Sequence, residues 1–291
     1  MKDRTRTILL LHLAVFLAGW TGVFGRIISL SGLPLVWYRI MVSIVTLAIV
    51  MACMGRFHRS SRQAVMKSAA CGLLLAFHWV AFYQSIQTSN VSVGVACIAT
   101  SCFFTTLFDP LINHRRISLK DVLISAIAIS GILLIFSLDV RYRVGIAWGL
   151  LSAAIYSVFS ILNVNVAKST GEDSATMLFY ELVGGVLVLS LCMLPYAASH
   201  AGAVAPGRSD LVGLLVLGSV LTVIPFLLQI HALRRLSAFT VNVTYNLEPI
   251  YSIIFAAFLF GETREVGLSF WLGISLVVIS VLLQTYRTQR R

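Results

Sequence analysis

The hydrophobic positions of this chain fall into long uninterrupted runs, separated by short clusters of charged and turn-forming residues. A helix that crosses ~30 Å of hydrocarbon needs roughly 20 apolar residues, and the chain contains ten runs of about this length. The runs are residues 7–25, 34–54, 66–86, 91–112, 119–138, 144–166, 174–197, 209–231, 237–260 and 267–286. Residues 182–194 are apolar on every face, whereas the strands of a membrane β-barrel alternate in polarity. The pattern therefore predicts transmembrane helices.

Composition supports this interpretation. Hydrophobic residues make up 58% of the 291 residues and charged residues only 11%, whereas soluble domains carry about 25% charged residues. The mean hydropathy of +0.92 also excludes a disordered chain. Connections such as residues 87–90 leave no room for a soluble domain. We expect an all-α integral membrane protein with ten transmembrane helices.

The basic residues predict the orientation of these helices. Sixteen of the 22 Lys and Arg residues fall on the side of the N-terminus, five fall on the other side, and Arg39 lies within a run. The positive-inside rule then places both termini in the cytoplasm of a multi-pass inner (plasma) membrane protein. The net charge of +11 is spread over short loops beside an anionic leaflet, so we expect no nucleic-acid partner.

Catalytic and metal-binding motifs are missing from the sequence. There is no HExxH, GxSxG or P-loop motif, and the five cysteines lie in or beside apolar runs without CxxC spacing. We therefore expect no catalytic residues, no metal, no cofactor and no enzymatic activity. The alternative from another class is an integral membrane enzyme or receptor that acts on a small ligand within the helix bundle.

The chain contains an internal repeat of five runs. Trp37-Tyr38-Arg39 near the start of the second run matches Phe179-Tyr180-Glu181 near the start of the seventh, and Gly131 in the fifth matches Gly273 in the tenth. An odd number of spans places the two copies, residues 1–138 and 139–291, in opposite orientations. Inverted repeats around a central cavity are typical of transporters that work by alternating access.

Three stretches resemble a known family. They are Ala238–Glu262, with Asn246-Leu247-Glu248-Pro249 followed by Phe260-Gly261-Glu262; Phe82–Ala96, which runs through Ser89-Asn90-Val91; and Gly131–Phe136 at the end of the first half. With ten spans, the chain resembles the EamA type of the drug/metabolite transporter superfamily. The resemblance implies two inverted five-helix repeats, a shared cavity, and movement of amino acids or related metabolites, and we expect the direction to be export.

Ionisable residues inside a span are costly and usually face a cavity or a partner. Arg39 and Glu181 occupy matching places in the two halves, next to Tyr38 and Tyr180. We expect the two charges to face each other across the cavity, where Arg39 binds a substrate carboxylate and Glu181 an ammonium group. The alternatives are a structural ion pair, or an Arg39 side chain that extends to the membrane interface.

Glu248 is the third ionisable residue deep in a run. Pro249 and Pro225 are expected to kink their helices, and the polar residues around Glu248 are expected to line the cavity unless they only satisfy one another. These neighbours are Asn242, Tyr245 and Asn246.

Other candidates for the cavity are aromatic or neutral polar residues. His78 lies next to Trp79 and one turn before Tyr83, where the histidine is either a proton relay or a neutral hydrogen-bond partner. Further aromatic walls and polar contacts are expected from Trp20, Trp148, Tyr156, Asn163 and Gln229. The partners we expect are a small-molecule substrate, the lipid bilayer and protons.

Overall fold

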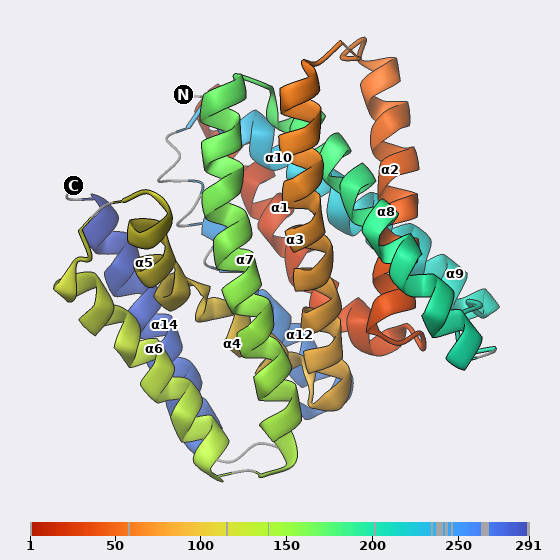
Figure 1. The fold of residues 1–291 in the computed structure, drawn as a ribbon. Coiled ribbons are helices and arrows are strands. Elements are labelled where there is room, and N and C mark those ends of the chain that lie inside the picture. The colour runs from red at the N-terminus through yellow and green to blue at the C-terminus, as the bar shows by residue number, and fades with distance from the viewer. Residues whose placement is uncertain are drawn as a thin grey trace.

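A computed structural model of the chain describes residues 2–57, 59–114, 116–138, 140–200, 202–233, 235–236, 241, 244–245, 247–262 and 268–289. The described residues form a bundle of helices (Figure 1). In chain order the helices are α1 (Lys2–Ile27), α2 (Gly32–Cys53), α3 (Arg62–Thr88), α4 (Val91–Ala99), α5 (Ser101–Ile112), α6 (Leu119–Leu138), η1 (Val140–Tyr142), α7 (Arg143–Thr170), α8 (Ser174–Ser199), α9 (Arg208–Leu215), η2 (Val216–Val223), α10 (Ile224–Leu233), α12 (Glu248–Phe260) and α14 (Leu268–Gln289).

The ten predicted spans are confirmed. Seven helical segments of the described part are long and apolar enough to cross a membrane, and α12 and the core of α14 are shorter apolar helices. The remaining predicted span, 119–138, coincides with α6. α12 begins at Glu248, so only the second part of the run 237–260 lies in one described helix.

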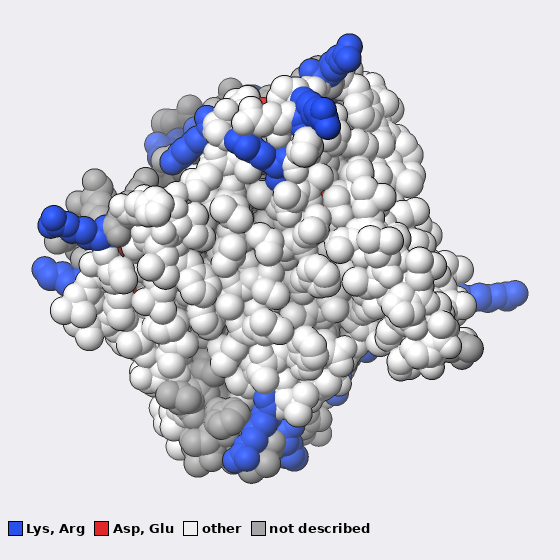
Figure 2. Space-filling view, viewed as in Figure 1, with Lys and Arg blue, Asp and Glu red and all other residues white. Residues whose placement is uncertain are grey.

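The outer surface of the bundle suits a bilayer. Large apolar side chains are exposed along the helices, for example Leu187, Leu191 and Leu194 on α8. Figure 2 shows Lys and Arg side chains at the ends of the bundle and a broad uncharged belt between them. This belt is the surface expected to face lipid.

The two halves run in opposite directions. α2 and α8 are the second helices of their halves, and they pack against each other. Ser31, just before α2, hydrogen bonds to Tyr196 near the end of α8, and Trp37 Nε1 donates to Ser190 Oγ at 2.9 Å. The start of α2 therefore lies beside the end of α8, and the two helices, which occupy equivalent positions in their halves, are antiparallel.

The last helices of the two halves meet at their matching glycines. A Cβ atom on Gly131 of α6 would lie 2.4 Å from the carbonyl oxygen of Gly273 on α14. The two helices lie side by side at one edge of the bundle in Figure 1. Glycine at both positions allows the backbones to approach closely.

α3 is packed between the two halves. It contacts α7 and α8 of the second half extensively, and glycines permit the closest approach. A Cβ on Gly72 would lie 1.9 Å from the carbonyl oxygen of Glu181, and one on Gly184 would lie 2.1 Å from that of Ala69. The backbones of α3 and α8 are therefore in direct contact at this crossing.

Two of the spans are interrupted. The fourth span breaks at Thr100 between α4 and α5, where Thr100 Oγ1 donates to the carbonyl oxygen of Cys97. The eighth span contains the π-helix η2, and Pro225 is the second residue of the helix that follows it. Pro249 is likewise the second residue of α12. Pro249 therefore lies in the first turn of α12, where a missing N–H is tolerated, whereas Pro225 lies inside the continuous helical segment Arg208–Ala232, directly after its π-helical part.

Candidate functional site

Arg39 of α2 is a buried cation whose side chain is held by two other elements, α3 and η2. Its side chain is 4% exposed, and its Nε donates to Thr222 Oγ1 at 3.0 Å while Nη1 donates to the Tyr83 hydroxyl at 2.8 Å. The guanidinium carbon lies 3.9 Å from the centre of the Trp79 ring. Such stacking stabilises a desolvated guanidinium, so Arg39 does not extend to the membrane interface.

The π-helix η2 brings Thr222 to Arg39. Thr222 Oγ1 donates to the carbonyl oxygen of Leu217, five residues earlier, at 2.7 Å. A Cβ on Gly218 would lie 2.9 Å from the Arg39 carbonyl oxygen, and Ser43 Oγ donates to the Gly218 carbonyl oxygen at 2.9 Å. Single π-helical turns often occur at functional sites. Thr222 was not among the residues predicted from the sequence, although it is one of few polar residues in its run.

Glu248 supplies the opposite charge. It interacts electrostatically with Arg39, Tyr83 and Tyr156. Tyr245 also interacts electrostatically with it. Among the described residues, however, Arg39 and Glu248 do not form an ion pair within 4.0 Å. The two charges therefore share one region of the bundle without direct contact.

His78 is fixed beside this region. Its Nδ1 lies 2.8 Å from Ser152 Oγ on α7 and 3.1 Å from the Ser152 carbonyl oxygen. Its ring centre is 4.8 Å from that of Tyr156. We call the whole group the Arg39 site, and it consists of Arg39, His78, Trp79, Tyr83, Tyr156, Thr222, Tyr245 and Glu248.

The structure does not place Glu181 opposite Arg39. Each is the eighth residue of its helix, and because α2 and α8 are antiparallel, equivalent positions lie at different depths. Trp37 is paired with Ser190, so Arg39 lies at the level of residue 188, about 10 Å along α8 from Glu181 at 1.5 Å per residue. Glu181 instead accepts a hydrogen bond from Asn163 Nδ2. The expected pairing of Arg39 with Glu181 is therefore wrong in this structure.

The other predicted cavity residues are dispersed. Trp20 stacks on Phe255 of α12, with ring centres 4.4 Å apart. Tyr38 packs edge-on against Trp37, and Tyr180 against Phe179. Gln229 is half-buried on α10. The predicted cavity residues Asn242 and Asn246 lie outside the described residues.

A second buried polar residue that was not among the predicted site residues is Glu262, which follows α12. Its Oε1 accepts hydrogen bonds from Arg26 Nη1 at 2.6 Å and from the Val91 amide at 3.0 Å. Its Oε2 accepts from the Ser92 amide at 3.0 Å and the Ser92 hydroxyl at 2.6 Å. Gly261 ends α12 with φ 66°, a conformation that glycine adopts readily.

We call these four residues, Arg26, Val91, Ser92 and Glu262, the Glu262 latch. Glu262 is 1% exposed and belongs to the second half, whereas its partners belong to the first. A carboxylate at a helix N-terminus is favoured by the free amides and the helix dipole. The signal was present in the sequence, because both stretches that meet here, Phe260-Gly261-Glu262 and Ser89-Asn90-Val91, carried the family resemblance.

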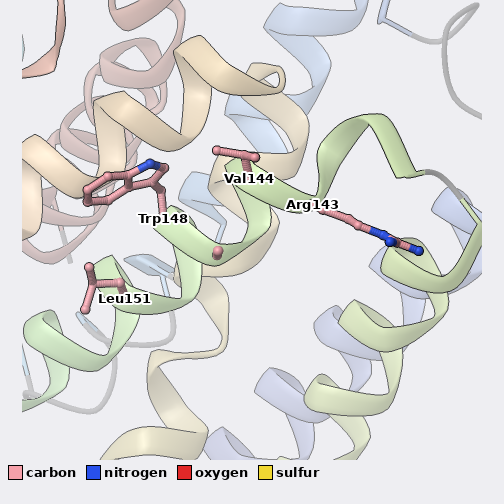
Figure 3. Close-up of a pocket in the computed structure, with 5 residues that line it drawn as sticks. Arg143, Val144, Trp148 and Leu151 are labelled. Atoms are coloured by element: carbon pink, nitrogen blue, oxygen red, sulfur yellow. The ribbon is translucent and has the colours of Figure 1, made fainter.

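A pocket lies away from the Arg39 site, along α7. It is lined by Arg143, Val144, Ala147, Trp148 and Leu151 (Figure 3). Val144 and Leu151 are 58% and 47% exposed, so this is an apolar depression on the outer face of one helix. Trp148, which we expected in the cavity wall, lines this depression instead.

Comparison with known proteins agrees with the fold. Residues 5–137 and 143–286 each match the EamA-like transporter family. The chain is 23% identical to an uncharacterized transporter, YxxF, of Bacillus subtilis (strain 168), over 99% of this chain and 92% of the relative. It is 22% identical to an uncharacterized transporter of Archaeoglobus fulgidus, over 93% of each chain.

A crystal structure of another protein superimposes with a TM-score of 0.63 at 13% identity, covering 96% of this chain and 98% of that one. This likeness concerns the fold alone. The two family matches together cover nearly the whole sequence, one in each half. The chain therefore belongs to the EamA-like transporter family and is a multi-pass membrane transporter.

Proposed function

We propose that this protein is a secondary transporter that exports amino acids or similar small metabolites by alternating access, with residues 1–138 and 139–291 as its two functional halves. The observation that carries the proposal is the Arg39 site, where a fixed guanidinium and a separate carboxylate lie in one aromatic region. Membership of the EamA-like family supports a transport function, and the Arg39 site supports amino acids or similar small metabolites as the substrate class.

Arg39 is suited to a carboxylate. A guanidinium has five N–H donors, and the hydrogen bonds to Thr222 and Tyr83 use Nε and one donor of Nη1. Among the described residues the remaining donors on the Nη edge have no protein acceptor, and they can bind two carboxylate oxygens, which is the geometry that arginine favours. Tyr83 and Trp79 keep the guanidinium plane fixed, so little ordering is required when a substrate binds.

Glu248 is suited to the ammonium group of the same substrate. A zwitterionic amino acid carries both charges, and the separated charges of Arg39 and Glu248 provide a matching pair. Tyr156 and Tyr245 interact with Glu248 and add aromatic surface for an apolar side chain. This combination favours amphipathic solutes over sugars or simple anions.

The Glu262 latch represents a closed gate in this proposal. It ties α12 to α1 and α4 at one end of the bundle. With both termini in the cytoplasm, as the basic residues indicate, this end faces outward.

Alkaline phosphatase fused after Arg291 should be inactive, and a fusion in the loop at residues 199–207 should be active. The reverse pattern would overturn this orientation.

The substrate is identified by a growth screen followed by reconstitution. Cells that produce the protein should tolerate inhibitory amino acids or analogues better than cells that lack it. Compounds found in this way should then move in liposomes that contain the purified protein. If no member of a broad panel of amino acids and related metabolites moves, with or without a proton gradient, the proposed function is wrong.

A further inference from the structure

We propose that Glu181 is a proton-binding site that couples transport to the proton gradient and is separate from the substrate site. The inference rests on the proposed function. Its chemistry is a single reversible step, in which the Glu181 carboxylate takes up one proton to form a carboxylic acid and later releases it on the other side of the membrane.

Glu181 lies deep in the protein and away from Arg39. Its side chain is 2% exposed, and it lies roughly 10 Å along α8 from the level of Arg39. The antiparallel pairing of Trp37 with Ser190 fixes this separation. A small amino acid held by Arg39 and Glu248 therefore leaves Glu181 free to bind another species.

The partner of Glu181 accommodates both protonation states. Asn163 Nδ2 donates to Glu181 Oε1, and the same amide carries a carbonyl oxygen that accepts a hydrogen bond from a carboxylic acid. Among the described residues, no Lys, Arg or His lies within 4.0 Å of the carboxylate. A permanently charged structural carboxylate at this depth is expected to have such a cation.

The helices packed against α8 contribute few groups that interact with Glu181. From α3 the Cys71 thiol interacts electrostatically with it, and from α7 there is the neutral amide of Asn163. Other titratable side chains on α2, α3 and α10 form no hydrogen bond or ion pair with it in the described structure. These are Tyr38, Arg39, Lys67, His78, Tyr83 and His231.

Protonation at Glu181 acts on α7 rather than on α3. The backbone of Glu181 is in direct contact with Gly72 of α3, which leaves that interface no space to adjust. The contact with Asn163, in contrast, is one side-chain hydrogen bond, which weakens when the carboxylate loses its charge. α7 also carries Ser152 and Tyr156, which contact His78 in the Arg39 site. The position of α7 therefore links the two sites.

The test compares the wild-type protein with Glu181→Gln, which resembles the protonated form. The matched control is Glu172→Gln in the connection between α7 and α8. Infrared difference spectra are recorded during pH titration of the protein in lipid. We expect a protonated-carboxyl band that Glu172→Gln retains and Glu181→Gln lacks; an unchanged band in Glu181→Gln would overturn the proposal.

Transport assays test the coupling with the amino acid identified by the growth screen. Glu181→Gln should keep exchange of labelled for unlabelled substrate but lose accumulation driven by a pH gradient, and Glu181→Asp should regain part of it. Equal loss of exchange and accumulation, or accumulation at the wild-type level, would contradict the coupling role. If the wild type exchanges substrate but never responds to pH, this inference fails while the proposed function stands. If the wild type exchanges nothing, the proposed function itself fails.

Discussion

Arg39→Ala should lose transport while still inserting into the membrane. The substitution removes the only buried guanidinium of the Arg39 site and leaves the Tyr83 hydroxyl and Thr222 without their donor. Removing one partner of a buried charge-assisted contact costs about 2–5 kcal/mol, and each 1.4 kcal/mol is a factor of about ten in affinity. We therefore expect substrate affinity to fall roughly 30-fold or more, measured by uptake in liposomes at equal protein content.

Two further variants separate substrate binding from folding. Arg39→Lys keeps the charge but loses the planar fork and the stacking on Trp79, so it should remain strongly impaired. Arg208→Ala removes an exposed arginine at the start of α9 and should transport normally. Wild-type uptake by Arg39→Ala, or equal loss in Arg208→Ala, would exclude Arg39 as the carboxylate-binding residue.

Glu262→Ala should shift the protein out of the conformation described here. Glu262 accepts four hydrogen bonds, including one from Arg26, and a hydrogen bond to a charged group contributes about 1.5–3 kcal/mol. Moving a two-state equilibrium from 1:99 to 99:1 takes about 5.5 kcal/mol, so this loss is large enough to open the latched end in much of the population. Arg26→Gln should have a smaller effect, because it removes one of the four hydrogen bonds and leaves those from Val91 and Ser92 in place.

Crosslinking measures the role of the latch directly. Arg26 and Glu262 are both replaced by cysteine in a background that lacks the exposed Cys53, and the pair is joined by a short reducible bifunctional reagent. Transport should stop on crosslinking and return on reduction, since the latched end must open in each cycle. Full transport by the crosslinked protein would show that this end stays closed during transport.

The ten helices could be predicted from the sequence because apolar runs long enough to span a bilayer have few alternatives. The run 119–138 coincides with α6, and the matching glycines Gly131 and Gly273 do meet. The same repeat led to the incorrect prediction that Glu181 faces Arg39. Equivalent residues of an inverted repeat lie at different depths, so the match between Arg39 and Glu181 in sequence indicated separation rather than contact.

Other features had weaker signals in the sequence. The π-helix at Val216–Val223 has no distinguishing pattern, since hydrogen bonds to the fifth preceding residue depend on packing against α2. Glu262 lies just beyond an apolar run and resembles a loop residue until the fold brings Val91 and Ser92 to it. Long-range contacts between halves decide both cases, and for Glu262 only the family resemblance of the two stretches that meet there pointed to it.

A structure with the identified amino acid bound shows whether the Arg39 site binds the transported solute. We expect the substrate carboxylate within hydrogen-bonding distance of the Arg39 Nη atoms, its ammonium group beside Glu248, and its side chain against the ring of Tyr156. Substrate bound elsewhere, with Arg39 still holding only Tyr83 and Thr222, would contradict it.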